Sequence, residues 1–190
     1  LASDKLFVAA NNMAGGITRF SVVRYGNVVG SRGSVVPLFQ QLIENNENYI
    51  PITHEKMTRF WITLQEGVDF VLKCMTRMQG GEIFVPKLFS FKILDLITTM
   101  AGNNNFEIIG IRPGEKLHEV MIPREESLNC IDLGKYYIIQ PMFYWWDTKN
   151  FKTYIGKKGK PVEKSFEYSS EKNTNWYTEK DLKKLLEKVL

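Results

Sequence analysis

Few side chains in this 190-residue sequence are suited to binding a metal or forming a disulfide. The only cysteines are Cys74 and Cys130, and the only histidines are His54 and His118. Neither histidine belongs to a HExxH motif or to a Cys/His cluster, so we expect no metal. Cys74 lies among apolar residues at helical spacing, which favours a buried free thiol over a disulfide or a metal ligand.

The sequence also lacks any apolar run long enough to cross a membrane, and no signal peptide opens it. Together with the low cysteine content, this predicts a protein of the reducing cytoplasm with no membrane partner. The net charge of +4 is mild, and the only basic run extends from Lys157 to Lys160. A short run of this kind is more often a solvated loop than a phosphate-binding patch, so we expect no nucleic-acid partner.

Several enzyme classes are not supported because their short motifs are missing. No serine lies in a Gly-x-Ser-x-Gly elbow, and no Ser-His-Asp or Cys-His set can be argued. The glycine turn at 26–33 has the spacing G-x-x-x-G-x-x-G instead of G-x-G-x-x-G, and no acidic residue follows at a strand end. We therefore do not interpret it as a first-strand dinucleotide fingerprint.

In hydride-transferring dehydrogenases of this type, a Tyr-x-x-x-Lys pair on a helix supplies the catalytic base. Both side chains project from one face, and the lysine lowers the pKa of the tyrosine. The spacing occurs at Tyr154–Lys158 and at Tyr168–Lys172. Both pairs lie in segments rich in Gly, Ser or Lys that carry no helical apolar stripe. We interpret both as chance matches.

What is present is an ordinary globular composition, with 44% apolar and 24% charged residues. It is compatible with one domain, or with a small domain and part of another. The pattern predicts a helix over 1–10, a buried strand over 20–25, the glycine turn, and a helix after Ser34 with Pro37 in its first turn. This order indicates an α/β chain. A chain that begins within a helix, without an initiator Met, is predicted to be cut from a longer protein.

Further elements are predicted along the rest of the chain. Thr63 and Glu66 form a capping-box pair that opens a helix. Thr178 with Asp181 caps a closing helix, and the pattern weakens after about residue 124. The remaining predictions are a buried stripe of Val68, Val71, Leu72 and Met75, strands at 82–86, 106–111 and 136–139, helices after Ser90 and near Glu115, and irregular chain over 147–175.

Three places could bind an anion. The turn at 26–33 presents backbone N–H groups and Arg32 beside a helix start, which suits a phosphate, although an ordinary βα turn is an equal alternative. Arg59 lies among bulky apolar residues, as either an ion-pair member or an anion clamp. Arg112 and Glu115 flank a Pro-Gly turn, where they could bind a diphosphate and a sugar hydroxyl. The alternative for Glu115 is a helix-start carboxylate favoured by the dipole.

Long segments of this sequence resemble, in order, the inverting UDP-N-acetylglucosamine 4,6-dehydratases, which are extended short-chain dehydrogenases. The resemblance covers nearly the whole chain and is weakest between about 125 and 160. Several long motifs in register are far more specific than any short pattern. The matching segments are FSVVRYGNVVGSRGSVVP at 20–37, MTRFWIT at 57–63, GGEIFVPK at 80–87, IGIRPGEKLHE at 109–119, FEYSS at 166–170 and NW at 175–176.

The resemblance implies an α/β fold made of the C-terminal part of a Rossmann-like domain and a smaller mixed α/β domain. It places the rest of the NADP-binding domain at 1–48 and the substrate-binding domain with the C-terminal tail at 49–190. It also implies tightly held NADP, UDP-N-acetylglucosamine as substrate, and a homo-oligomer, with a hexamer as the family's form. The family makes the first intermediate of pseudaminic acid biosynthesis, which supplies sugar for flagellin glycosylation.

The residue roles that the resemblance implies are narrower than the family's full site. Its catalytic Thr-Asp-Lys and Tyr-x-x-x-Lys groups would precede Leu1, so this chain is expected to be inactive and to hold no catalytic residue. Val28 matches a position beside the nicotinamide carboxamide, which shifts the turn at 26–33 toward a functional role. The positions that match substrate-binding residues are Asn27, Arg32, Gly33, Ser34, Val35, Val36, Arg59, Arg112 and Glu115.

In the family's reaction, hydride leaves sugar C4 for NADP⁺, water is lost across C5–C6, and hydride returns to C6 while C5 is protonated from the opposite face. Two alternatives stay open beside it. One is a related dehydratase or epimerase that acts on another UDP-sugar. The other is a stand-alone nucleotide-sugar binding module, which would fold alone and bind UDP saturably, whereas a fragment lacking most of its sheet would expose apolar faces and aggregate.

Overall fold

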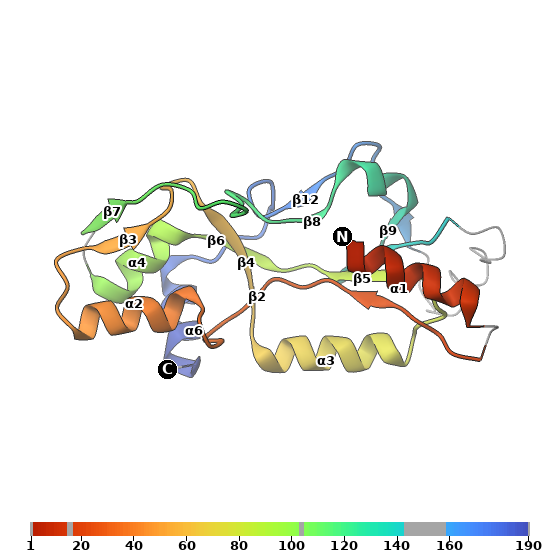
Figure 1. Ribbon diagram of the computed structural model, residues 1–190, viewed down its shortest axis with the longest axis horizontal. Helices are drawn as coiled ribbons and strands as arrows, with labels where there is room; N and C mark the ends of the chain where they lie inside the picture. The colour runs from red at the N-terminus through yellow and green to blue at the C-terminus, as the bar shows by residue number, and fades with distance from the viewer. Residues whose placement is uncertain (1, 15–16, 103–104, 143–158, 190) are drawn as a thin grey trace. The chain divides into compact units, whose positions relative to one another are not determined.

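The computed structural model describes residues 2–14, 17–102, 105–142 and 159–189 (Figure 1). The chain forms two compact units, each assembled from separate segments. Unit 1 comprises Leu1–Tyr25, Gln65–Lys87 and Met121–Tyr168, and unit 2 comprises Gly26–Leu64, Leu88–Val120 and Ser169–Leu190. Neither unit coincides with the ranges 1–48 and 49–190, so the assignment of those ranges to cofactor and substrate binding stays a prediction.

Unit 1 contains a five-stranded sheet in the order β1-β5-β10-β9-β11. β1 pairs with β5 in parallel, with Val22 opposite Ile83, whereas the other pairs are antiparallel. α1 contacts β1 at the sheet's edge (Figure 1). The elements of this unit are α1 (Ala2–Met13), β1 (Val22–Val23), α3 (Leu64–Met75), β5 (Ile83–Pro86), the 3-10 helix η1 (Arg124–Asn129), β9 (Cys130–Asp132), β10 (Tyr136–Ile139) and β11 (Lys160–Pro161).

The core of unit 1 lies between α3 and the sheet. Cys74 and Phe70 of α3 pack against Phe84 and Ile138, which are fully buried. The buried stripe predicted for α3 is therefore wrong, because Val68, Leu72 and Met75 are 44%, 55% and 62% exposed. The apolar residues of α3 lie on most sides of the helix. Their spacing alone therefore did not identify the side that packs on the sheet.

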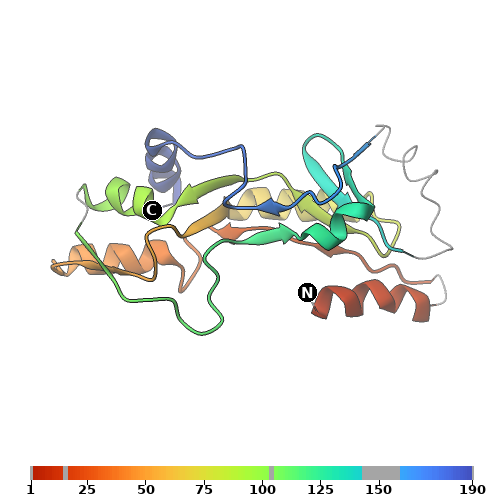
Figure 2. The ribbon, with the colours of Figure 1, turned by 90° about the horizontal axis from the view of Figure 1, so that it is seen from above.

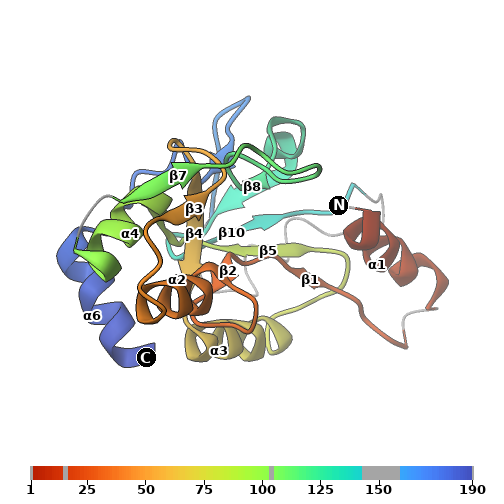
Figure 3. The same cartoon turned by 60° about the vertical axis from the view of Figure 1, so that its left-hand side comes forward.

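Unit 2 contains two small sheets and three helices. β2, β4 and β6 form one sheet, and β3 pairs with β7 in parallel, with Ile50 opposite Phe106. Figure 2 shows α4 between α2 and α6, and Figure 3 shows β3 and β7 beside these helices. The elements are β2 (Asn27–Val28), α2 (Val35–Glu44), β3 (Ile50–Ile52), β4 (Thr58–Ile62), β6 (Phe89–Lys92), α4 (Ile93–Ala101), β7 (Phe106–Ile108) and α6 (Glu179–Val189).

The core of unit 2 joins all of these layers. Trp61 of β4 stacks on Phe91 of β6 with ring centroids 4.1 Å apart. Phe39 of α2, Leu96 of α4 and Leu182 of α6 are almost fully buried in the same cluster. Burial of these large side chains supplies most of the stabilisation of the unit, at about 1.5–3 kcal/mol for each.

The predicted caps and strand ends had mixed outcomes. The cap of the closing helix is confirmed, because Thr178 Oγ1 donates to Asp181 Oδ2 over 2.6 Å and accepts from the Asp181 N–H. The helix predicted after Ser90 is confirmed as α4, which begins at Ile93 after Lys92, while Ser90 itself lies within β6. The strand predicted over 106–111 ends at Ile108.

The helix predicted near Glu115 is wrong, because residues 109–119 form neither helix nor strand. Gly110 and Gly114 have φ values of 86° and 81°, which a right-handed helix does not allow. The chain then continues into β8 (Val120–Ile122) and later β12 (Tyr168–Ser169). Tyr168 lies in a strand and not in a helix, which agrees with the interpretation of Tyr168–Lys172 as a chance match. Tyr154, Lys157 and Lys158 lie outside the described residues.

Candidate functional site

Unit 2 encloses a cavity of about 290 Å³. Its apolar lining comes from α2, β3, β4, β6 and α4, and its polar lining comes from the glycine turn, the end of β3, β4 and the loop after β7. A pocket with an apolar floor and a few convergent polar groups is the usual form of a small-molecule site. The polar and charged side chains that line it are Asn27, Ser34, Thr53, Arg59, Arg112 and Glu115.

The glycine turn brings the start of α2 to this cavity. Gly26 runs so close to β4 that a Cβ there would lie 2.6 Å from the Phe60 carbonyl oxygen. Gly33 has a φ of 76°, which lets the chain turn directly into α2 at Val35. The first N–H groups of a helix have no intrahelical acceptor and carry a partial positive charge, so this end of the cavity suits an anion.

Ser34 stands at the N-cap of α2 but makes no capping hydrogen bond with its side chain. Its hydroxyl is buried and has no hydrogen-bond partner among the described residues. A buried hydroxyl without a partner costs about 1–3 kcal/mol. Because Ser34 lines the cavity, a bound ligand atom could satisfy this group.

Arg59 projects from β4 and its side chain is only 12% exposed. Its guanidinium donates to the carbonyls of Thr58 and Leu117, and its nearest carboxylates are Glu119 at 3.7 Å and Glu115 at 4.0 Å. Burial lowers the pKa of Arg59, and these two carboxylates offset only part of that effect. The residue stays charged, so a buried and loosely compensated cation lies at the wall of the cavity.

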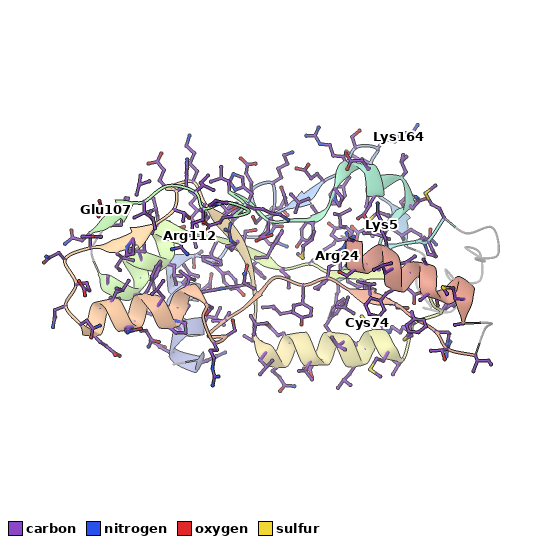
Figure 4. All side chains as sticks on the ribbon, viewed as in Figure 1. Lys5, Arg24, Cys74, Glu107, Arg112 and Lys164 are labelled. Carbon is purple, nitrogen blue, oxygen red and sulfur yellow. The ribbon has the colours of Figure 1, made fainter. Side chains whose placement is uncertain are left out.

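Arg112 and Glu115 lie in the loop after β7, where Figure 4 labels Arg112. The Glu115 carboxylate accepts from the Arg112 N–H over 3.3 Å and from Thr53 Oγ1 over 3.3 Å. The bond from Thr53 ties the loop to the end of β3, and the bond from Arg112 lies within the loop. The Arg112 side chain is exposed at the rim of the cavity, where it can reach a ligand without giving up a buried partner.

The structure brings together most of the predicted substrate-binding residues, whose roles stay predictions. Arg32 is exposed and does not line the cavity, and the Val36 side chain is fully buried in the core. Val28 lies in β2 outside the cavity lining, where it pairs with Ile62 and its carbonyl accepts from the Ser31 N–H. The residues that line the cavity as predicted are Asn27, Gly33, Ser34, Val35, Arg59, Arg112 and Glu115.

The sequence analysis missed Thr53, Met57 and Trp61 as cavity residues. Thr53 follows β3, whose partner β7 lies more than fifty residues away, and no local pattern announces that pairing. Trp61 lies in β4, a strand that was not predicted, and the direction of its side chain depends on the register with Phe89 of β6.

The described residues contain little that could bind a dinucleotide or a metal. No group of three or more His, Cys, Asp or Glu side chains in that part of the chain could hold a metal ion. The turn at 26–33 lacks the G-x-G-x-x-G spacing that brings a backbone close to a pyrophosphate. No helix in the described part of the chain has the length and apolar character needed to span a membrane.

Comparisons with known proteins agree with this geometry. A profile of the family described as polysaccharide biosynthesis protein matches residues 1–141. The UDP-N-acetylglucosamine 4,6-dehydratase (inverting) of Campylobacter jejuni subsp. jejuni serotype O:2 is 52% identical over 98% of this chain and 57% of its own length. The UDP-glucose 4-epimerase of Rickettsia bellii (strain OSU 85-389) is 38% identical over 89% of this chain and 49% of its own.

A solved structure extends the likeness to the fold. Pen from Bacillus thuringiensis superposes with a TM-score of 0.81 at 29% identity, covering 99% of this chain and 56% of that chain. This chain thus spans about half the length of these relatives. The resemblance to the inverting dehydratases and the α/β fold of an extended short-chain dehydrogenase are both confirmed. This chain belongs to the polysaccharide biosynthesis protein family.

Proposed function

We propose that this chain is the substrate-binding part of a UDP-N-acetylglucosamine 4,6-dehydratase that inverts C5. The observation that carries the proposal is the convergence of Arg59, Arg112 and the start of α2 on one cavity. The name of a relative 52% identical to this chain supports the choice of substrate. The sequence predicts that the chain alone is inactive, and we propose that it still binds the nucleotide-sugar.

The side chains divide the work by charge. Arg59 and Arg112 are suited to the two phosphates of UDP, because guanidinium groups donate paired hydrogen bonds to phosphate oxygens. The Ser34 hydroxyl and the first N–H groups of α2 add neutral donors at the same end. Glu115 and Asn27 are left to accept from sugar hydroxyls. Holding the diphosphate in one place fixes the position of the sugar carbons that react.

The relation to extended short-chain dehydrogenases implies a nicotinamide cofactor, which we propose to be NADP. When bound, such a group accepts and returns hydride. The described residues do not form a site that fits it, and Val28 alone is proposed to lie near it. The contribution of this chain is therefore to bind and orient the sugar, and no chemical step is assigned to its side chains.

We further propose the biological setting that the resemblance implies. The product would be a UDP-2-acetamido-2,6-dideoxy-4-keto-hexose used in pseudaminic acid biosynthesis and flagellin glycosylation. The complete protein would be a cytoplasmic homo-oligomer, with the hexamer as its form. In-frame coding sequence for a Tyr-x-x-x-Lys helix directly before Leu1 would support the dehydrogenase-type assignment.

Calorimetric titration of the 190-residue protein with UDP-N-acetylglucosamine tests the proposal. We expect saturable binding that Arg112→Ala weakens about tenfold, since a charged hydrogen bond is worth about 1.5–3 kcal/mol. Arg124→Ala removes an equally exposed positive charge in unit 1 and serves as the matched control. Absence of binding, or equal losses in both variants, would refute the assignment. Turnover above a heat-killed control would refute the expected inactivity.

A second candidate is a related epimerase, which the 38% identity to a UDP-glucose 4-epimerase favours. It predicts that UDP-glucose binds at least as tightly as UDP-N-acetylglucosamine. Titration with both sugars, and product analysis of the complete protein, separate the two enzymes. A stand-alone binding module differs from both, because the coding sequence before Leu1 would then contain no Tyr-x-x-x-Lys helix.

A further inference from the structure

The loop that carries Arg112 and Glu115 has no regular hydrogen bonding of its own. Residues 109–119 form neither helix nor strand, and Gly110 and Gly114 both have positive φ values. Loops of this kind normally sample several conformations, which weakens any ligand contact made from them. Something outside residues 112–115 must therefore set their position if they are to bind a ligand tightly.

A cluster of three polar side chains lies behind this loop. Thr58 Oγ1 is 2.7 Å from His118 Nδ1 and 2.7 Å from Ser170 Oγ. Thr58 is 4% exposed and Ser170 is fully buried, so water competes little for these bonds. None of the three side chains lines the cavity, and the cluster joins three segments that are distant in the sequence.

Backbone bonds extend the cluster into the loop. The Glu119 N–H donates to Ser170 Oγ over 2.9 Å, and the Ser170 N–H donates to the Glu119 carbonyl over 2.8 Å. On the other side, the Thr58 N–H donates to the Leu117 carbonyl over 3.1 Å. The C-terminal end of the loop is thus held between β4 and the segment that follows β12.

The Thr58 hydroxyl has a role that an apolar group of the same shape cannot fill. It carries one donor and can also accept, so it can bond to the ring nitrogen of His118 and to the Ser170 hydroxyl together. Ser170 can in turn donate to the Thr58 carbonyl, 3.1 Å away. Replacing the hydroxyl by a methyl group would leave the buried Ser170 hydroxyl and the half-buried His118 ring each short of one partner.

We propose that Thr58, His118 and Ser170 are positioning residues, which hold the 112–117 loop at the cavity so that Arg112 and Glu115 can bind the nucleotide-sugar. This inference rests on the proposed function, because it assigns those two residues to ligand binding. The three side chains touch no ligand themselves. They act through the backbone of His118, whose ring bonds to Thr58, and through the Glu119 N–H, which donates to Ser170 Oγ.

Two variants of one residue test the proposal. Thr58→Val keeps the shape of the side chain and loses the hydroxyl, whereas Thr58→Ser keeps the hydroxyl and loses a methyl group. Thr99→Val makes the same change in α4, where the Thr99 hydroxyl donates to the Asp95 carbonyl over 2.7 Å, and serves as the matched control. Two quantities are measured for each protein: amide hydrogen exchange over 112–117 without ligand, and calorimetric affinity for UDP.

We expect exchange over 112–117 to become about tenfold faster in Thr58→Val, and UDP affinity to fall about tenfold. Thr58→Ser should stay close to the wild type in both measurements, and Thr99→Val should change neither. A role in stability alone would lower the melting temperature of Thr58→Val and leave loop exchange and affinity unaltered, which would overturn the proposal. Should Thr58→Val not fold, Ser170→Ala is measured in its place with the same expectations.

The two readouts separate this inference from the proposed function. Loop exchange is measured on the free protein, so it reports positioning whether or not UDP binds. If the wild type binds no UDP, the proposed function fails. If the wild type binds UDP and Thr58→Val binds it equally well, only the positioning role fails.

Discussion

Two arginines, one in each unit, show how differently the molecule treats a buried positive charge. The side chains of Arg24 in unit 1 and Arg59 in unit 2 are both 12% exposed. Arg24, labelled in Figure 4, donates to Asp4 over 2.8 Å and to both oxygens of Glu126 over 2.6 and 3.0 Å. Arg59 has its nearest carboxylate oxygens at 3.7 and 4.0 Å.

The difference in distance reverses the electrostatic outcome. Burial alone would lower the pKa of Arg24, but its bonds to Glu126 and Asp4 outweigh burial and raise it. For Arg59 burial dominates and the pKa is lowered. Arg24 therefore has its charge fully matched by protein groups, as expected for a structural residue. Arg59 would gain from a further anion, as expected for a residue that binds phosphate.

The largest expected effect comes from Arg24. Arg24→Met should destabilise the protein by about 3–5 kcal/mol, because it leaves the Asp4 and Glu126 carboxylates without their buried partner. Urea unfolding followed by circular dichroism measures this loss. A fall in the unfolding free energy of less than about 1 kcal/mol would show that the ion pairs of Arg24 do not hold β1 and α1 together.

Arg59→Met should have a smaller effect on stability and a larger one on binding. We expect a loss of UDP affinity of about thirtyfold, or about 2 kcal/mol, since a charged hydrogen bond to phosphate is removed. Its unfolding free energy should fall less than that of Arg24→Met, because Glu115 and Glu119 stay partly exposed. If Arg59→Met instead unfolds the protein and leaves the affinity of the folded fraction unaltered, the two arginines have the same structural role.

The smallest expected effect concerns the thiols of unit 1. Burial raises the pKa of Cys74 and of Cys130 to about 12, so almost no thiolate is present at pH 8. Iodoacetamide at pH 8 should leave both thiols unmodified in the folded protein and should alkylate both in urea, as mass spectrometry would show. Rapid alkylation without urea would mean that the packing around these residues opens readily.

Local patterns predicted the elements that depend on neighbouring residues. α2 begins after Ser34 with Pro37 in its first turn, and α6 begins with the Thr178–Asp181 cap, as the sequence indicates. Such local patterns could not predict which strands pair when they are distant in the sequence. The β3–β7 pair places Ile50 beside Phe106, and this pairing helps to bring the loop with Arg112 to the cavity.

Two predicted helix features failed for physical reasons that can be named. The apolar residues of α3 surround most of the helix, and tertiary packing selected the face with Phe70 and Cys74 over the face with Leu72. A loop forms where a helix was expected at Glu115, because the carbonyls of Leu117 and Glu119 accept from the Thr58 and Ser170 N–H groups and not from a helical turn. The candidate site residues came from long motifs and not from helix or strand periodicity. Most of them line one cavity, and their roles stay predictions.

The most direct test of the account is a hydrogen-exchange footprint of UDP-N-acetylglucosamine on the 190-residue protein. The account predicts slower exchange at the start of α2, along 51–59 and over 112–119, which are the parts of unit 2 that line or hold the cavity. It predicts no change in β5, β9 and β10 of unit 1. Protection confined to unit 1, or none at a saturating concentration of the sugar, would contradict the assignment of this cavity to substrate binding.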